Sequence, residues 1–307
     1  MRKIALGKSN LEVPVVAVGC MRINRIEKKA AASFIRKSLD LGAYFFDNAD
    51  IYGRNTCEEA LAGALKDAGA RREDVVIQTK CGIVPGRMFD FSKEHILNSV
   101  EGSLSRLKTD YIDILLLHRP DALVEPEEVA EAFEILHKSG KVRNFGVSNQ
   151  NPGQIRLLQK YVKYPLLANQ LQLSITNATM ITQGIHVNRV NDEYSVDRDG
   201  GILDFCRLED ITIQPWSPFQ YGIFEGVFIG SPKYPELNAK LTEKAQKYGV
   251  SETTITMAWL LRHPAKMQPV TGTMNEGRLE DCVKAADITL SREDWYELLL
   301  SAGSDLP

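Results

Sequence analysis

The feature that most constrains this chain is a regular alternation of short apolar runs with amphipathic stretches. Eight apolar runs have the length of buried strands, at 15–18, 44–46, 75–79, 112–117, 144–147, 167–171, 211–215 and 268–271. The stretches between them predict helices; over 27–41, for example, Phe34, Ile35 and Leu39 fall near one face. Eight continuously apolar strands separated by helices predict a closed parallel (β/α)8 barrel, the TIM barrel of the α/β class.

The rest of the chain fits one such barrel. A β-hairpin is expected over 4–13, turned at Lys8-Ser9-Asn10, before the first strand. Additional helices are expected after the last strand. No low-complexity linker divides the chain, so we expect residues 1–307 to form a single domain. A doubly wound sheet is disfavoured because it needs fewer strands and usually a G-x-G-x-x-G turn, which the sequence lacks.

Composition excludes several classes of protein. Charged residues make up 25% and hydrophobic residues 44%, as in ordinary soluble proteins. The net charge of -3 is spread without a basic block, so no nucleic-acid partner is expected. No run of 18 apolar residues and no signal segment is present, which predicts a cytoplasmic protein without a membrane partner. We expect a monomer or a weak homo-oligomer.

Cysteine and histidine spacing argues against metal and disulfide sites. The five cysteines are widely spaced and include no C-x-x-C pair, so they are interpreted as reduced thiols. The five histidines form no metal-binding pattern such as H-E-x-x-H. Catalysis without a metal is therefore expected.

Polar residues at the predicted strand ends are few. Asp47 ends the second strand, Tyr52 follows it closely, Lys80 ends the third strand and His118 ends the fourth. In barrels of this kind the C-terminal ends of the strands and the loops after them build the active site. The four side chains are thus expected to lie together at the C-terminal end of the barrel, which is called its mouth below. The long segments 172–200 and 217–236 leave the same end, and long loops in compact domains are usually functional.

These four residue types suit reduction of a carbonyl group. Hydride addition leaves an alkoxide, which requires a proton donor and a group that polarises the oxygen. A free tyrosine, with a pKa of ~10, is a reluctant donor, but a nearby ammonium stabilises its phenolate. Lys80 can supply that charge, Asp47 can hold it, and a neutral His118 can orient the carbonyl oxygen. Tyr52 is therefore the predicted proton donor.

The motifs around these residues resemble those of the aldo-keto reductase superfamily, and segment 269–275 with Trp295-Tyr296 is similar to its bacterial NADP-dependent branch. The resemblance extends over almost the whole chain and rests on five segments in the family's order: 46–53, Lys80, His118-Arg119-Pro120-Asp121, 146–149 and 216–219. It implies an Asp47, Tyr52, Lys80, His118 tetrad and NADP(H) bound across the mouth. The implied substrate is a small carbonyl compound.

The resemblance also implies how each part of the cofactor is held. Ser148, Asn149 and Gln170 match residues that hydrogen-bond the nicotinamide carboxamide, and Trp216 matches the aromatic residue that stacks on the ring. These residues are expected to set which face of the ring is offered to the substrate.

A second group matches the phosphate-binding residues of the family. Ser217, Phe219 and Gly222 lie where a loop covers the pyrophosphate. Thr273 and Arg278 match a hydroxyl and a guanidinium that bind the 2'-phosphate, which favours NADP over NAD.

The sequence departs from the family pattern at several positions. Gly272 replaces a lysine found in many relatives, which predicts weaker NADPH affinity. Gly82 and Arg119 stand where steroid- and aldose-binding members often have aromatic residues, so a steroid pocket is not predicted. Arg119 either attracts a substrate carboxylate or phosphate, or pairs with Asp121 or a nearby loop acid; we favour the second interpretation.

Other interpretations stay open from sequence alone. Asp47 and Lys80 can form a purely structural ion pair, and Ser148-Asn149 can cap a helix before Pro152. A Schiff-base aldolase or lyase that uses Lys80, or a non-catalytic NADP(H)-sensing subunit, also fits. The reductase is favoured because every signal falls at one end of one barrel. The sequence does not name the physiological substrate.

Overall fold

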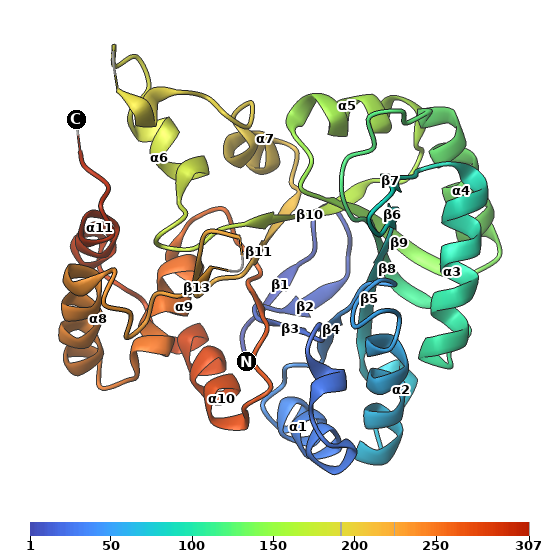
Figure 1. Cartoon of the computed structure of the whole chain (residues 1–307), viewed down its shortest axis with the longest axis horizontal. Coiled ribbons are helices and arrows are strands. Elements are labelled where there is room, and N and C mark those ends of the chain that lie inside the picture. The colour runs from blue at the N-terminus through green and yellow to red at the C-terminus, as the bar shows by residue number, and fades with distance from the viewer. Residues whose placement is uncertain (191, 224, 307) are drawn as a thin grey trace.

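The computed structural model describes residues 1–190, 192–223 and 225–306, and its centre is a closed barrel of parallel strands (Figure 1). In chain order the barrel strands are β3 (Ala17–Gly19), β4 (Phe45–Asp47), β5 (Val76–Cys81), β8 (Ile112–Leu117), β9 (Val142–Ser148), β10 (Leu166–Gln172), β11 (Thr212–Trp216) and β14 (Val270–Thr271). The barrel closes where Val270 of β14 pairs with Ala17 of β3. Each overlaps a predicted run, so the (β/α)8 fold class is confirmed.

Helices surround the barrel (Figure 1). They are α1 (Lys28–Asp40), α2 (Cys57–Ala68), α3 (Lys93–Leu107), α4 (Pro126–Lys138), α5 (Pro152–Tyr161), α6 (Thr179–Ile185), α7 (Ile202–Leu208), α8 (Pro235–Tyr248), α9 (Glu252–Arg262), α10 (Glu276–Lys284) and α11 (Arg292–Ser301). Short 3-10 turns are η1 (Ile23–Arg25), η2 (Arg72–Asp74), η3 (Glu193–Ser195) and η4 (Ala285–Asp287). The helices after β14, α10 and α11, are the predicted C-terminal additions.

Local sequence signals explain where individual helices begin. Pro126 occupies the first turn of α4, where its missing N–H costs no hydrogen bond. In α5 the Asn151 side chain accepts from the Gln154 backbone N–H, and Gln154 accepts from that of Asn151, both at 2.9 Å. The cap before Pro152 is therefore Asn151, not Ser148-Asn149, and this leaves the latter pair for another role.

The N-terminal hairpin closes one end of the barrel. Its strands are β1 (Lys3–Ala5) and β2 (Glu12–Pro14), and its Leu6 and Val13 pack into an apolar cluster with the first residues of several barrel strands. At the turn, Gly7 has φ +54 and a Cβ there would lie 2.5 Å from the Leu167 carbonyl oxygen, so glycine is required. Figure 1 shows the hairpin across the middle of the ring of strands. The open mouth is consequently at the C-terminal strand ends.

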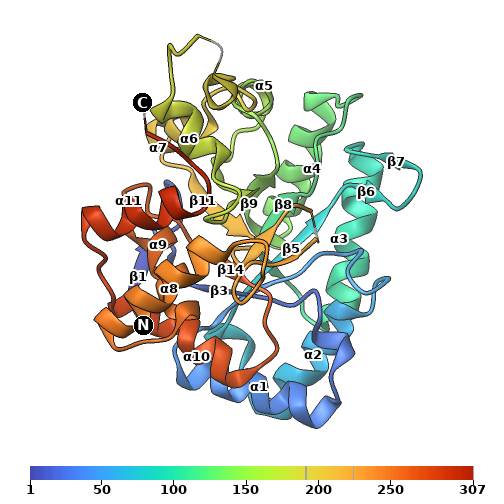
Figure 2. The same cartoon turned by 60° about the vertical axis from the view of Figure 1, so that its left-hand side comes forward.

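The two long segments at the mouth contain structure of their own. Segment 172–200 includes α6 and η3, and it contacts the C-terminal tail, where Tyr194 Oη donates to the Gly303 carbonyl at 3.1 Å. Figure 2 shows α6 beside the end of the chain. Segment 217–236 includes β12 (Gln220–Tyr221) paired with β13 (Gly226–Val227). A further short pair, β6 (Ile83–Val84) with β7 (Met88–Phe89), follows β5. None of the helices in the described ranges has both the length and the hydropathy needed to span a bilayer.

Candidate active site

A lysine and an aspartate form a buried ion pair at the C-terminal ends of β4 and β5. Lys80 Nζ lies 2.8 Å from Asp47 Oδ2 and donates to the Asn48 carbonyl at 2.7 Å. Asp47 pairs in register with Gln78, two residues before Lys80, so the Gln78 and Lys80 side chains lie on one side of β5. Burial by itself lowers the pKa of Lys80, but the Asp47 charge and its hydrogen bond outweigh burial and raise it. Lys80 is therefore an ammonium at neutral pH.

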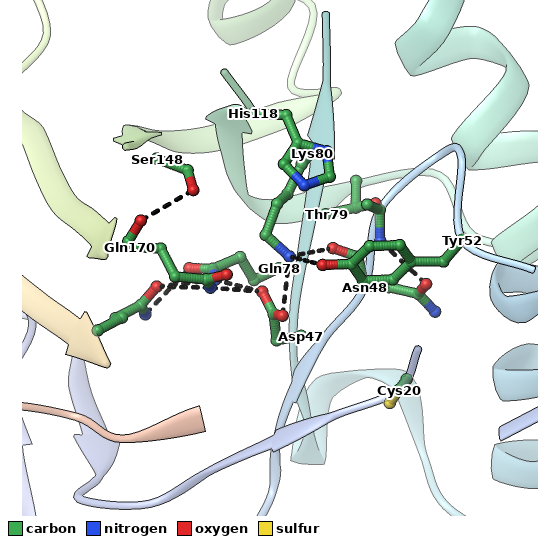
Figure 3. A network of polar contacts seen from close by, with 12 residues as sticks. Cys20, Asp47, Asn48, Tyr52, Gln78, Thr79, Lys80, His118, Ser148 and Gln170 are labelled. Carbon is green, nitrogen blue, oxygen red and sulfur yellow. Dashed lines mark hydrogen bonds and ion pairs between the residues drawn. The ribbon is translucent and has the colours of Figure 1, made fainter. Parts of the chain in front are cut away.

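Tyr52 contacts this pair from the loop after β4. The loop is held against β5 because the Asp50 N–H donates to the Lys80 carbonyl at 3.0 Å. Lys80 Nζ donates to Tyr52 Oη at 3.2 Å and lies 4.8 Å from the ring centroid. Figure 3 shows the ammonium between Asp47 and Tyr52. Because the ammonium is the donor, the phenol's own proton is not used in this contact.

The acidity of Tyr52 differs from the simple sequence argument. Burial raises the pKa of Tyr52, and the Lys80 charge opposes that rise without reversing it. The nearby ammonium favours the phenolate, as expected from the sequence, but the loss of solvent around the phenol disfavours the phenolate more strongly. Tyr52 is thus fully protonated at neutral pH, and the neighbouring cation stabilises the phenolate that remains once the proton has left.

His118 completes the group from the end of β8. Its ring stands edge-on to the Tyr52 ring, with centroids 5.7 Å apart and planes at 78°. Burial, then the charges of Lys80 and Arg119, hold the pKa of His118 well below its usual range, so the ring is neutral. Its buried Nδ1 has no hydrogen-bond partner among the described residues. A buried nitrogen without a partner is unusual and fits a site where a ligand supplies the missing contact.

Behind the ion pair, glutamine side chains cross the barrel interior. Gln78 Nε2 and Gln170 Nε2 donate to Asp47 Oδ1 at 2.6 and 3.0 Å. Gln214 exchanges hydrogen bonds with Gln78 at 2.9 and 3.1 Å, and donates to Gln268 at 2.8 Å. The carboxylate therefore has fixed donors on one oxygen and Lys80 on the other, which holds it in place beside the ammonium. Sequence reasoning missed this role of Gln78, Gln214 and Gln268; polar residues inside otherwise apolar strands were the available signal.

The predicted nicotinamide residues lie together on neighbouring strand ends. Asn149 Nδ2 donates to Ser148 Oγ at 2.8 Å, and Trp216 Nε1 donates to Asn149 Oδ1 at 3.1 Å. Ser148 Oγ donates to the Gln170 carbonyl at 2.9 Å. The Gln170 side-chain amide, in contrast, donates to Asp47 and Gln214 inside the barrel. The structure thus joins Ser148, Asn149 and Trp216, while the Gln170 amide nitrogen donates to Asp47 and Gln214.

The predicted pyrophosphate residues follow β11. Ser217 has φ +53 and its hydroxyl donates to Gln220 Oε1 at 3.0 Å. The Phe219 ring is partly buried against the core. Gly222 has φ +57, and its carbonyl accepts from Gln172 Nε2 at 2.6 Å. These residues lie beside Trp216 on the β11 side of the mouth, in a short, internally bonded loop.

The predicted 2'-phosphate residues lie at the start of α10. Thr273 Oγ1 accepts from the Asn275 N–H at 3.1 Å, and Arg278 is exposed in the first helical turn. Arg22 Nη1 donates to the Gly272 carbonyl at 3.1 Å, and a Cβ on Gly272 would lie 2.7 Å from that nitrogen. A side chain at 272 would need only the flexible end of Arg22 to move, so this contact does not require glycine here.

Arg119 does not form the pair that we favoured from sequence. Both Asp121 carboxylate oxygens accept backbone N–H groups, from Phe91 and Leu123, each at 2.8 Å. No carboxylate in the described part of the chain lies within 4 Å of the Arg119 guanidinium. Its Cζ lies instead 5.8 Å from the centroid of the Trp216 ring. The expected structural pairing with Asp121 or a loop acid is therefore wrong.

A second group of acids lies buried beside the loop that follows β4. Glu58 accepts from Thr79 Oγ1 at 2.6 Å and from Arg106 Nε at 2.8 Å. Asp50 is 6% exposed, and its Oδ1 has no partner among the described residues. Burial, with Glu58 adding to it, raises the pKa of Asp50 to about 7. Sequence reasoning quoted Asp50 only as part of a motif and did not predict this environment.

Metal-binding geometry is absent from the described ranges, where no three His, Cys, Asp or Glu side chains are grouped to hold an ion. The five cysteines are free thiols and all are buried. Burial raises the pKa of Cys20 and of Cys81, so both thiols near the mouth are protonated. Protonated, buried thiols are poor nucleophiles.

Comparison with known proteins shows the same family along almost the whole chain. Residues 15–299 match the model of the Aldo/keto reductase family. The chain is 36% identical over 321 residues, with 100% of both chains covered, to the uncharacterized oxidoreductase YcsN of Bacillus subtilis. It is 36% identical over 313 residues, 97% of each chain, to a 6-dehydroglucose reductase of Agrobacterium fabrum.

Solved structures agree with this assignment. A thermostable aldo-keto reductase crystallised with the inhibitor epalrestat matches with a TM-score of 0.77 and 27% identity, over 99% of this chain and 100% of that one. Its barrel and this one share the same fold. The chain is therefore an oxidoreductase that belongs to the aldo/keto reductase family.

Proposed function

We propose that this protein reduces an aldehyde or ketone to the alcohol, with NADPH as the cofactor and Tyr52 as the proton donor. The observation that carries the proposal is the direction of one hydrogen bond. Lys80 Nζ donates to Tyr52 Oη at 3.2 Å while it is paired with Asp47, so the phenol retains a proton to give. The buried, unpartnered His118 Nδ1 lies beside it.

The residues of the mouth fit a nicotinamide dinucleotide. Trp216 offers an aromatic face and is oriented by Asn149, which stands beside Ser148. Arg278 and Thr273 at the start of α10 would hold a 2'-phosphate, which a guanidinium binds well. When bound, NADP(H) supplies the hydride.

The chain's own residues account for the proton and for the charge. Neutral His118 hydrogen-bonds the carbonyl oxygen and orients it, through whichever ring nitrogen carries the hydrogen. Tyr52 gives its proton to that oxygen as negative charge develops there. Lys80 then neutralises the phenolate, and Asp47, fixed by Gln78 and Gln170, keeps Lys80 charged and in place.

The substrate class follows from the relatives and from the mouth. The Agrobacterium fabrum relative is a 6-dehydroglucose reductase, so polar, sugar-like aldehydes belong in the first screen. The family acts on small carbonyl compounds, and the mouth is polar at Tyr52, His118 and Arg119. NADPH oxidation over small aldehydes, ketones, dicarbonyls and sugars, run in parallel with NADH, tests class and cofactor together.

Tyr52→Phe tests the proton donor. Turnover should fall by roughly 10²-fold or more, because general-acid catalysis has that magnitude, while NADPH binding changes little. Tyr248→Phe is the matched control, since Tyr248 also lies beside lysine and aspartate but far from the mouth. Steady-state kinetics measures the turnover of each variant, and fluorescence titration measures its NADPH binding. Equal turnover in Tyr52→Phe and the parent would remove Tyr52 from the mechanism.

Arg278→Ala tests the cofactor preference. The variant should bind NADPH at least 10-fold more weakly and NADH almost unchanged, because only NADPH carries the 2'-phosphate. Dissociation constants for both cofactors, measured by fluorescence titration, give the ratio. An unchanged ratio would place the phosphate site elsewhere.

The two rival functions predict different results. A Schiff-base enzyme needs an unprotonated lysine. Lys80 instead donates hydrogen bonds to Asp47, to the Asn48 carbonyl and to Tyr52, and its pKa is raised. Borohydride trapping of an adduct on Lys80, without NADPH oxidation, would support the lyase. A sensing subunit would bind NADPH that no carbonyl compound oxidises. The single-domain organisation of 1–307, the monomeric or weakly oligomeric state and the cytoplasmic location stay predictions.

A further inference from the structure

Arg119 extends over the mouth from the residue directly after His118. Its Cζ lies 5.8 Å from the centroid of the Trp216 ring, which belongs to the end of β11. In the barrel order β9 and β10 lie between β8 and β11. The arginine therefore reaches across the ends of two intervening strands, on the same side of the barrel as Tyr52 and His118.

The guanidinium is half-buried, yet its charge is not balanced. Other partly buried arginines in this protein have acceptors: Arg72 is 2.6 Å from Asp113 and Arg106 is 2.8 Å from Glu58. Arg22 and Arg262 donate to the backbone carbonyls of Gly272 and Leu290. No carboxylate of the described ranges lies within 4 Å of Arg119, and no described group accepts a hydrogen bond from it. Removing a cation from water without a partner costs free energy, and arginine does not lose its proton to relieve that cost. Within the described part of the chain, the guanidinium thus has donors that no group uses and a charge that no carboxylate balances.

The Arg119 charge also acts on its neighbours in the mouth. The Arg119 charge contributes, after burial and Lys80, to holding the pKa of His118 below its usual range. The Lys80 charge is neutralised by Asp47, so Arg119 supplies the remaining positive field at the place where the carbonyl oxygen would lie.

We propose that Arg119 is an anion-recognition residue and that the substrate is a small aldehyde or ketone carrying a carboxylate. The planar, fork-shaped guanidinium matches a carboxylate with two parallel hydrogen bonds. The proposal deepens the proposed reductase function and rests on it. Binding of the cofactor 2'-phosphate by Arg119 is disfavoured, because Thr273 and Arg278 follow β14, which is separated from β8 by β9, β10 and β11 in the barrel.

The test compares two substrates that differ in charge. Succinic semialdehyde and its methyl ester are reduced by the parent protein, by Arg119→Met and by Arg119→Lys. In the parent, kcat/KM for the acid should exceed that for the ester by at least about 10-fold, and the preference should weaken with added salt. Arg119→Met should bring the ratio close to one, mainly through KM, and Arg119→Lys should retain part of it.

Arg156→Met is the matched control. Arg156 lies on α5, with its Cζ 5.0 Å from the Phe205 ring centroid, so it is another arginine over an aromatic ring but outside the mouth. This variant should keep the parent's ratio. A parent that treats acid and ester alike overturns the proposal, as does a preference that survives in Arg119→Met. A change in KM for NADPH alone would assign Arg119 to the cofactor and also overturn it.

A binding measurement separates this proposal from the reductase function. Calorimetry should show that the parent binds 4-hydroxybutyrate, the alcohol product, at least about 10-fold more tightly than Arg119→Met does. Absence of binding to the parent contradicts the anion site. Binding that depends on Arg119 without any NADPH oxidation keeps the anion site but refutes the reductase. Tighter binding of 4-hydroxybutyl phosphate than of 4-hydroxybutyrate would show that phosphate is the preferred anion and would overturn the carboxylate assignment.

Discussion

Two regions of this protein place a buried lysine, an aspartate and a tyrosine together, and they differ in how the tyrosine is hydrogen-bonded. In the mouth, Lys80 is paired with Asp47 and donates to Tyr52. Between α8 and α11, Lys244 lies 2.9 Å from Asp294, and Tyr248 Oη donates to the same carboxylate at 2.6 Å. The residue types are the same, but the Tyr52 hydroxyl accepts a hydrogen bond from lysine, whereas the Tyr248 hydroxyl donates one to aspartate.

That difference separates a structural cluster from a reactive one. The proton of Tyr248 is already used on Asp294, which also accepts from Lys247 and Ser291. The hydrogen bonds of Lys247, Tyr248, Lys244 and Ser291 hold the pKa of Asp294 far below its usual range, although burial acts against them. In the mouth, Tyr52 keeps its proton and lies beside His118, whose Nδ1 has no hydrogen-bond partner among the described residues. A buried ion pair is therefore no sign of function by itself.

Lys80→Met should have the largest effect on activity. It removes the charge that stabilises the Tyr52 phenolate and that Asp47 anchors, so turnover should fall by roughly 10²- to 10⁴-fold. Single-turnover kinetics with saturating cofactor, on protein shown to be folded by circular dichroism, measures the change. Retention of more than a tenth of the parent's turnover would mean that the two clusters do not differ in the way described.

Asp294→Asn should have a large effect on stability and little on turnover. Removing a buried charge leaves Lys244 and Lys247 without their common anion, which costs about 3 kcal/mol of unfolding free energy. Urea unfolding measures the loss. Below the midpoint of urea unfolding, where the variant is folded, its kcat should stay within about twofold of the parent's, since the cluster lies outside the barrel mouth. A fall in kcat as large as that of Lys80→Met would contradict the comparison.

Asp50→Asn should produce the smallest change, and one that depends on pH. Unlike Asp47 and Asp294, Asp50 is a buried acid without a basic partner, and burial with Glu58 raises its pKa to about 7 from 3.8. Between these values the unfolded chain binds fewer protons at this site, so the parent loses stability as pH rises from about 4 to about 7.

The asparagine does not ionise, so the variant should gain at least about 1 kcal/mol relative to the parent between pH 5 and pH 8. Urea unfolding at the two pH values measures the difference between variant and parent. A difference that does not change with pH, or one that changes in the opposite sense, would show that Asp50 is already ionised in the folded protein.

Much of the fold and of the candidate site can be predicted from the sequence. Burial on both faces produces continuous apolar runs, and these located every barrel strand within a few residues. Parallel strands place their C-terminal ends together, so Asp47, Tyr52, Lys80 and His118 could be assigned to one mouth without knowing any distance. The structure brings all four together.

The errors and omissions concern partners that are distant in the chain. Gln170 donates to Asp47 across 123 positions, and Gln78 and Gln214 exchange hydrogen bonds across 136. Arg119 was assigned to Asp121 because the two are close in sequence, whereas Asp121 instead accepts the backbone N–H groups of Phe91 and Leu123. Sequence proximity was a poor guide because loop acids often bond to nearby backbone N–H groups.

The sequence by itself determined the barrel, its N-terminal hairpin and the identity of the mouth residues, because hydrophobic periodicity and the positions of strand ends can be read locally. Only the tertiary structure decided that the Tyr52 proton is not used by Lys80 and that two glutamines anchor the Asp47 carboxylate. It also decided that Arg119 has no acid partner among the described residues. These properties depend on the direction and number of contacts made when the barrel closes, and closure brings together groups that no local pattern relates.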